Sequence, residues 1–324
     1  MTGAPQDQGR LACPLCAGLA QTRVWTVTAE AILSGLSREW GACISGDAFP
    51  VPIEATFTLH ECDGCGLHFF VPALAGGAAF YQELMATVPY ETSQSRWEFG
   101  QVVRELGPGD RVVDFGCGDG AFLRMAKPLV RQAVGVDRNP DAIERLGQAG
   151  LTGEETSCSE FAQSHPEGFD VVCAFHTLEH VAEISEFMTA VVGCVRPGGR
   201  VFLSVPNRRR LARQNSEPLD CPPHHLSRWD PAQWRVLAER FGLELRAMQF
   251  QEPALSHVKL LYRQRLDRGY GRLLRRPAPA LALRACAKLL VGPRRHERRA
   301  RRGWYSRQGL YGHAMLAEFV RPSP

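Results

Sequence analysis

The stretch at residues 112–125 constrains the fold more than any other part of the 324-residue chain. A β-branched apolar run ends there at Asp114, and apolar residues return at helical spacing after a turn. The turn carries glycines at alternate positions, Gly116, Gly118 and Gly120. Glycines admit positive φ angles and leave room for a ligand, and the following helix presents unpaired N–H groups. The sequence therefore predicts a strand, a tight turn and a helix, with a nucleotide-like ligand against the turn.

Short apolar segments and helical segments alternate beyond this turn. We expect strands at 133–137, 169–175 and 200–205, and helices at 139–150 and 181–195. Buried strands separated by helices imply a parallel, doubly wound sheet whose ligands bind at the carboxyl ends of the strands. The second strand ends at Asp137, 23 residues beyond Asp114. A carboxylate in that place can accept both hydroxyl protons of a ribose.

Four cysteines near the N-terminus form two CxxC pairs, Cys13 with Cys16 and Cys62 with Cys65. Two such knuckles complete a tetrahedral site, so the spacing predicts a structural zinc ion rather than unrelated free thiols. The 45 residues between the pairs exceed the usual ribbon spacing, whereas Gly66 after the second pair favours a metal-binding turn. Because four thiolates leave no open position for a substrate, we assign no chemistry to this zinc.

Composition and charge bound the class of protein. The chain is 44% hydrophobic, which is enough for a full core, and its 11 cysteines are spread along it as reduced thiols would be. The N-terminus lacks a signal peptide and no stretch approaches the roughly 18 apolar residues of a spanning helix, so we expect a cytoplasmic protein.

Charge is distributed unevenly along the chain. Residues 254–303 hold 15 Lys and Arg against two acids, a charge of +13, whereas the remaining 23 basic and 32 acidic residues give −9. We therefore expect any anionic partner at residues 254–303.

The glycine turn by itself also satisfies the G-x-G-x-x-G/A fingerprint of NAD-binding proteins. Asp114 before the turn, the extra Gly120, and Glu179-His180 after the fourth strand instead favour S-adenosylmethionine. Four segments resemble the class I methyltransferase family in order and spacing, over about residues 100 to 250. They are residues 112–120, 134–137, 169–181 and 195–200, the last of which lead into the fifth strand. The resemblance implies a Rossmann-like α/β fold, a doubly wound seven-stranded sheet whose last strand is antiparallel.

The resemblance also implies contacts with S-adenosylmethionine. Gly116 and Gly118 let the backbone approach its methionine and ribose portions, Asp114 lies near its amino group, and Asp137 binds its ribose hydroxyls. The adenine site is expected near residues 157–160, where the sequence departs from the commoner form that contains Gly-Asp. The predicted cofactor-binding residues are Asp114, Gly116, Cys117, Gly118, Asp137, Arg138, Cys158, Ser159, Phe175 and His176.

A loop at residues 220–229 is expected over the methyl donor, and it carries two histidines, His224 and His225, behind two prolines. An imidazole, with an ordinary pKa near ~6.5, can take a proton from the acceptor as the methyl group transfers. Since neighbouring side chains in an extended loop point apart, we expect one of the two histidines to face the site as a catalytic base. The next candidate is His176. Alternatively, the pair caps the helix that begins near Asp230.

The pattern divides the chain into five predicted parts. They are a zinc-ribbon-like module (1–72), a helical linker or lid (73–108), an S-adenosylmethionine-binding α/β core (109–252), a basic helical insertion (253–304) and a C-terminal strand of the core (305–324). Tyr81 and Tyr90 are candidates for lining the ligand edge of the sheet, the alternative being that each serves core or surface packing. In the insertion, apolar residues interleaved with arginine fit helices lying on an anionic membrane face, a surface for RNA phosphates, or a solvated helical hairpin.

These observations predict an S-adenosylmethionine-dependent methyltransferase that acts on an O, N or C atom of a small molecule or sugar, lipid- or carrier-linked acceptors included, in polysaccharide or natural-product biosynthesis. The layout also resembles sugar C-methyltransferases, which share a zinc-bearing N-terminus and a histidine base. We expect peripheral association with an anionic inner membrane face through residues 254–303, and the sequence gives no indication of oligomeric state.

Two alternatives stay open. The first is a ribosomal RNA methyltransferase with a zinc module, which is disfavoured because the fourth strand ends in Phe175-His176-Thr177-Leu178 and not in an Asn-Pro-Pro-Tyr type of motif. The second is a binding protein that keeps the fold without catalysis.

Overall fold

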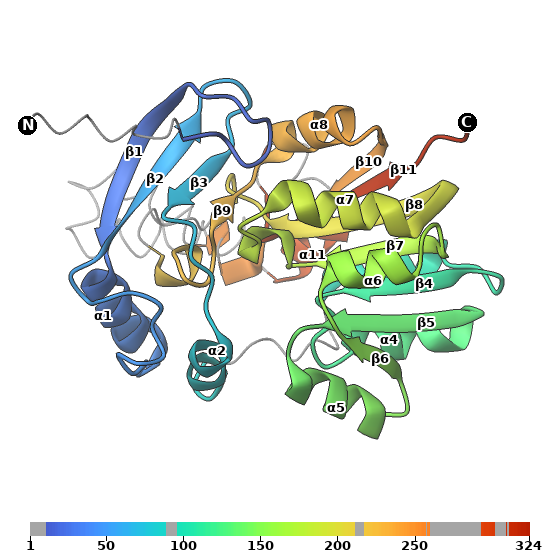
Figure 1. The fold of residues 1–324 in the computed structure, drawn as a ribbon, viewed down its shortest axis with the longest axis horizontal. Coiled ribbons are helices and arrows are strands. Elements are labelled where there is room, and N and C mark those ends of the chain that lie inside the picture. The colour runs from blue at the N-terminus through green and yellow to red at the C-terminus, as the bar shows by residue number, and fades with distance from the viewer. Residues whose placement is uncertain are drawn as a thin grey trace, which may run out of the picture.

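A computed structural model describes residues 11–88, 96–210, 217–256, 258–259, 293–301, 309 and 311–324. Two sheets organise these residues, a small one at the left of Figure 1 and a seven-stranded one at the right. The strands and helices in chain order are β1 (Gln21–Thr28), α1 (Ala29–Trp40), β2 (Thr56–Cys62), β3 (His68–Val71), α2 (Ala78–Met85), α3 (Trp97–Val102), β4 (Arg111–Phe115), α4 (Ala121–Ala126), β5 (Gln132–Asp137), α5 (Pro140–Gln148), β6 (Thr152–Glu155), α6 (Cys158–Ser164), β7 (Phe169–Phe175), the 3₁₀ turn η4 (Leu178–His180), α7 (Ile184–Cys194), β8 (Val195–Pro206), the 3₁₀ turn η5 (Pro218–Asp220), β9 (Ser227–Arg228), α8 (Pro231–Arg240), β10 (Glu244–Phe250), α11 (Pro293–Arg301) and β11 (Ala314–Val320).

The large sheet has the strand order β10-β11-β8-β7-β4-β5-β6. Strands β4 to β8 are parallel, whereas β11 runs antiparallel to both β8 and β10. The predicted doubly wound sheet with an antiparallel last strand is therefore confirmed. Because the parallel strands share one direction, the residues that follow β4, β5 and β7 meet at the same edge.

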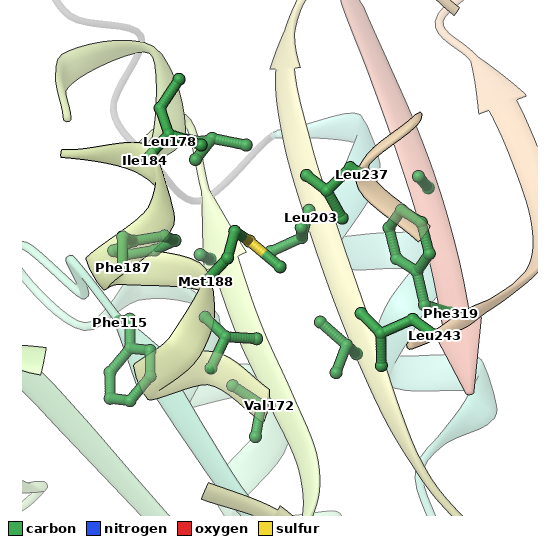
Figure 2. Packing of buried hydrophobic residues seen from close by; sticks show 14 of the residues in the cluster. Phe115, Val172, Leu178, Ile184, Phe187, Met188, Leu203, Leu237, Leu243 and Phe319 are labelled. Atoms are coloured by element: carbon green, nitrogen blue, oxygen red, sulfur yellow. The ribbon is translucent and has the colours of Figure 1, made fainter. Parts of the chain in front are cut away.

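Helices cover both faces of this sheet. Side chains of α6, α7 and α8 pack on one face in a cluster that includes Phe161, Met188 and Trp234. Side chains of α3, α4 and α5 pack on the other face, together with Phe175 of β7. Figure 2 shows residues of α7 and α8 meeting those of β8 and β11 in the first cluster. This burial on both sides is why the strands read as nearly continuous apolar runs in the sequence.

The small sheet has the order β1-β2-β3-β9 and is antiparallel throughout. Its first three strands come from the N-terminal region, and α1 packs with them in a hydrophobic cluster of its own. The fourth strand comes from the far end of the loop that carries the histidine pair, since Phe69 pairs with Ser227 and His68 with Arg228. The loop at residues 220–229, which we call the acceptor loop, is thus a structural part of the N-terminal sheet, a connection that the sequence pattern did not indicate.

The basic insertion lies mostly outside the described residues, and so does Tyr90. Its described part includes α11, in which five of nine residues are arginine. Among the helices that the model describes, none is long and apolar enough to cross a membrane.

Candidate functional site

The glycine turn between β4 and α4 has the predicted conformation. Gly116, Gly118 and Gly120 have φ angles of 72°, 54° and 73°. A Cβ atom on Gly116 would stand 2.5 Å from the Thr177 hydroxyl oxygen, so a side chain at this position is excluded. At Gly118 a Cβ atom would meet nothing within 4 Å. The backbone is therefore open to a ligand at this second glycine.

Two acidic side chains adjoin the turn. Asp137, at the end of β5, accepts hydrogen bonds at 2.9 Å from the backbone N–H groups of Gly118 and Asn139. Asp114 is buried, and burial together with the nearby charge of Asp137 raises its pKa well above the ordinary value. Its Oδ1 atom has no hydrogen-bond partner among the described residues. A buried carboxylate oxygen without a donor is costly, and the cationic amino group of a ligand would satisfy it.

The remaining predicted cofactor-binding residues lie in three different surroundings. Arg138 lines an open hollow of about 410 Å³ beside β6, together with Ser157 and Glu160. Ser159, by contrast, donates its hydroxyl to Glu186 at 2.6 Å. The other predicted residues are packed in or against the hydrophobic clusters, namely Cys117, Cys158 and Phe175.

His176 follows β7 and is held between two buried glutamates. Its Nε2 atom lies 2.9 Å from Glu98 of α3, and its Nδ1 atom lies 3.2 Å from Glu179 of η4. Burial alone would lower the pKa of His176, but the contacts with Glu179 and Glu98 outweigh it and raise the pKa to about 9. Sequence reasoning missed Glu98. An acid set among Trp97, Phe99 and other apolar residues of a short helix was the signal that could have found it.

Three histidines converge between η4 and the loop that precedes β9. We call His180, His224 and His225 the histidine cluster. One nitrogen from each lies within 4.8 Å of the others. The expectation that neighbouring histidines point apart was wrong, because the rings of His224 and His225 are stacked with centroids 4.5 Å apart and planes 18° from parallel. The reason is that the loop is a turn and not extended, since both residues donate their backbone N–H to the carbonyl of Cys221.

The alternative that the pair caps the next helix is also wrong. Asp230 caps α8 with its own carboxylate, which accepts a hydrogen bond from Ala232 at 2.9 Å.

Hydrogen bonds orient two of the three imidazoles. Nδ1 of His225 lies 3.2 Å from the carboxylate of Asp220, and Nδ1 of His180 lies 2.5 Å from the carbonyl oxygen of His224. Burial would raise the pKa of Asp220, but His225, Arg210 and Arg228 hold it well below the ordinary value. Asp220 is a second residue that sequence reasoning missed. In the sequence, Asp220 was indicated only by its position in the loop that carries His224 and His225.

Tyr81 brings the helix α2 to the same place. Its hydroxyl oxygen lies 3.3 Å from Nδ1 of His180, and its ring packs edge-on against His224 with centroids 5.8 Å apart. Burial lowers the pKa of His180 to about 4, although Glu179 opposes this effect. The cluster therefore joins α2, η4 and the acceptor loop, and it contains neutral imidazole at physiological pH.

The four N-terminal cysteines form a single group, with all four sulfur atoms within 4.8 Å of one another. The Sγ atoms of Cys13 and Cys65 are 3.6 Å apart, and those of Cys16 and Cys62 are 3.5 Å apart. Tetrahedral zinc with Zn–S bonds of about 2.3 Å requires sulfur atoms about 3.8 Å apart. The donor set and its spacing thus fit one zinc ion, as the sequence predicted.

The region around the glycine turn is similar to known methyltransferases. A family model described as a methyltransferase domain matches residues 88–248. The chain is 37% identical over 110 residues to a ubiquinone biosynthesis O-methyltransferase of Burkholderia thailandensis and 33% identical over 110 residues to that of Aeromonas salmonicida. These matches cover 31% and 32% of the chain, and it spans about half the length of these relatives, 46% in both cases.

Among solved structures, a SAM-dependent methyltransferase from Archaeoglobus fulgidus aligns with 69% of this chain and 91% of its own, at 17% identity and a TM-score of 0.46.

Proposed function

Since residues 88–248 of the chain belong to the class I S-adenosylmethionine-dependent methyltransferase family, we propose that the protein transfers a methyl group from S-adenosylmethionine to a small molecule. The observation that carries this proposal is the buried, unsatisfied oxygen of Asp114 beside the open backbone of Gly118. The sulfonium donor has both an amino group and a ribose to place there. The two acids and the open glycine stand at one edge of the sheet, as such a ligand requires.

The chain's own residues have separate tasks in this proposal. Asp137 accepts the ribose hydroxyls, Asp114 accepts the amino group, and the hollow beside Arg138 and Ser157 takes the adenine. The sulfonium carbon is already reactive and its thioether leaves readily. The protein therefore has to align donor and acceptor, exclude water and remove one proton.

The acceptor proposed here is a small hydroxylated compound such as a sugar or a natural product. The relatives are named as O-methyltransferases, which favours an oxygen nucleophile for this chain as well. The acceptor's proton goes to the histidine cluster, where Asp220 holds the Nδ1–H of His225 and leaves Nε2 as the proton acceptor.

Binding of the methyl donor tests the proposal directly. In calorimetric titration, Asp137→Ala is expected to bind S-adenosylmethionine about 10²-fold more weakly than wild type, because a hydrogen bond to a charged group contributes about 1.5–3 kcal/mol. The control is Asp141→Ala, which removes an exposed acid four positions along the chain and should bind as wild type does. A wild-type chain that gives no heat, or an Asp137→Ala chain with unchanged affinity, contradicts the proposal.

A structural zinc ion in the cysteine group is part of the same proposal. The variant Cys62→Ser/Cys65→Ser is expected to hold one equivalent of zinc less than wild type by elemental analysis and to melt at a lower temperature, because structural zinc contributes directly to folding. The control is Cys43→Ser, which changes an exposed cysteine outside the group. Full zinc content in the double variant would exclude the site.

The basic insertion adds a proposal about location. Residues 254–303 would hold the protein at an anionic membrane face, because the 15 Lys and Arg of this stretch attract lipid phosphates. This association would bring the active site to lipid-linked acceptors.

A further inference from the structure

The histidine cluster has the composition of a metal site of a different kind from the cysteine group. Each of its three members offers an imidazole nitrogen, and these nitrogens lie within 4.8 Å of one another. His224 and His225 are 6% and 8% exposed and the side chain of His180 is 24% exposed, so the cluster is mostly buried and not a chance gathering on the surface. We propose that His180, His224 and His225 together bind a divalent transition-metal ion, zinc being the best match to three imidazoles.

The hydrogen bonds around the cluster are of the kind that hold metal-binding histidines. A metal-binding histidine nearly always donates its other ring N–H to a carboxylate or a backbone carbonyl. His225 has this arrangement with Asp220, and His180 has it with the carbonyl oxygen of His224. Because both oxygens accept at Nδ1, the hydrogen is on that atom, and Nε2 keeps its lone pair for the metal.

The surrounding charges suit a cation. The carboxylate of Glu179 lies 4.0 Å from Nε2 of His180, and that of Asp220 adjoins His225. Two carboxylates beside the three imidazoles offset the charge of a divalent ion. Imidazole nitrogen also differs in softness from the thiolates of the cysteine group, so the two sites are distinguishable by their ligands.

Three protein ligands leave a fourth position open, which the cysteine group does not. What the ion does there rests on the proposed function, but its binding does not. An acceptor hydroxyl on the ion loses its proton to water more readily, and its oxygen then attacks the sulfonium methyl carbon. The C–S bond breaks and S-adenosylhomocysteine leaves. In this arrangement His225 is a ligand and the ion replaces it as the group that promotes proton loss.

Metal content of the full chain tests the proposal. Wild type reconstituted with zinc and freed of loosely bound metal is expected to hold two equivalents, and Cys62→Ser/Cys65→Ser one. The variant His180→Asn/His225→Asn should also hold one, and the variant with all four changes none. The control is His165→Asn, which changes a histidine at the end of α6 and should keep both equivalents. One equivalent in wild type that disappears with the cysteines overturns the proposal.

X-ray absorption of the zinc-loaded wild type keeps the proposal testable even if the histidine variant fails to fold. Mixed nitrogen and sulfur scattering is expected, and sulfur scattering alone overturns the three-histidine site. Titration of the same preparations with S-adenosylmethionine tests the proposed function separately. A chain that binds the donor but only one zinc refutes the metal site alone, whereas a chain with two zincs and no donor binding refutes the proposed function alone.

Discussion

Replacing His225 with asparagine is expected to lower kcat for methyl transfer about 10²- to 10⁴-fold, the range that a positioned proton acceptor supplies. The imidazole is buried and oriented by Asp220, so its Nε2 atom is fixed in place. Asparagine has similar polarity, but it can neither accept the proton nor replace the imidazole as a ligand of the proposed metal ion that would promote proton loss, so the expected loss is the same in both arrangements. The measurement is transfer of labelled methyl from S-adenosylmethionine to the hydroxylated acceptor that gives the highest wild-type turnover in a panel of sugars and phenols.

The control for this variant separates chemistry from binding. Affinity for S-adenosylmethionine should not change, since the proposed donor contacts lie at the glycine turn. His165→Asn, remote from the cluster, should keep the wild-type kcat. A kcat of the His225→Asn variant within about threefold of wild type at saturating acceptor would remove the histidine cluster from proton transfer, because a positioned base contributes at least about 10²-fold.

The second large effect is on stability. His176→Asn is expected to lower the free energy of unfolding by about 3–5 kcal/mol at pH 6, because it leaves the buried carboxylates of Glu98 and Glu179 without their shared cation. These glutamates are 2% and 1% exposed. Asparagine is the suitable replacement, since His176 has a φ of 52° and asparagine tolerates that left-handed conformation. Urea unfolding measures the change.

The pH dependence of this effect follows from the raised pKa. His176 has a pKa of about 9 in the folded chain against an ordinary value of 6.5, so its stabilisation is complete below pH 6.5 and is lost as pH rises through 9. The groups that face it are Glu98, Glu179 and the stacked ring of His313. Burial lowers the pKa of His313 to about 3, so this ring stays neutral throughout the range. The difference between wild type and variant should therefore shrink from pH 6.5 to pH 9.

A companion variant distinguishes charge from packing. His176→Asn/Glu98→Gln removes one of the unpaired carboxylates and should recover part of the lost stability. If the double variant is no more stable than His176→Asn, or if the single variant loses less than about 1 kcal/mol, the buried ion pairs of His176 do not stabilise the fold as expected.

Local patterns predicted much of the fold and part of the site. The glycine turn, the position of Asp137 at the end of β5 and the two cysteine pairs all depend on residues close in sequence, and spacing alone identifies them. Alternation of strand and helix then fixed the parallel sheet, because few topologies join such elements.

The remaining features depend on contacts between distant residues. The ion pair of Glu98 with His176 crosses from α3 to the end of β7, and the pairing of Phe69 with Ser227 joins the N-terminal sheet to the acceptor loop. No local pattern records such contacts. The stacking of His224 on His225 was mispredicted for a different reason. The loop was read as extended, whereas the hydrogen bonds to Cys221 make it a turn.

The pairing of β3 with β9 joins the loop that carries the histidine pair to the N-terminal sheet. If S-adenosylmethionine binds at the glycine turn as proposed, the donor is recognised by residues after position 110, whereas the loop with the histidine pair is joined to the N-terminal sheet through Phe69 and Ser227. Exchange of the N-terminal part between related chains is then expected to alter which compound is methylated, while the methyl donor stays the same. The small N-terminal sheet would in that case set the selectivity of the proposed reaction.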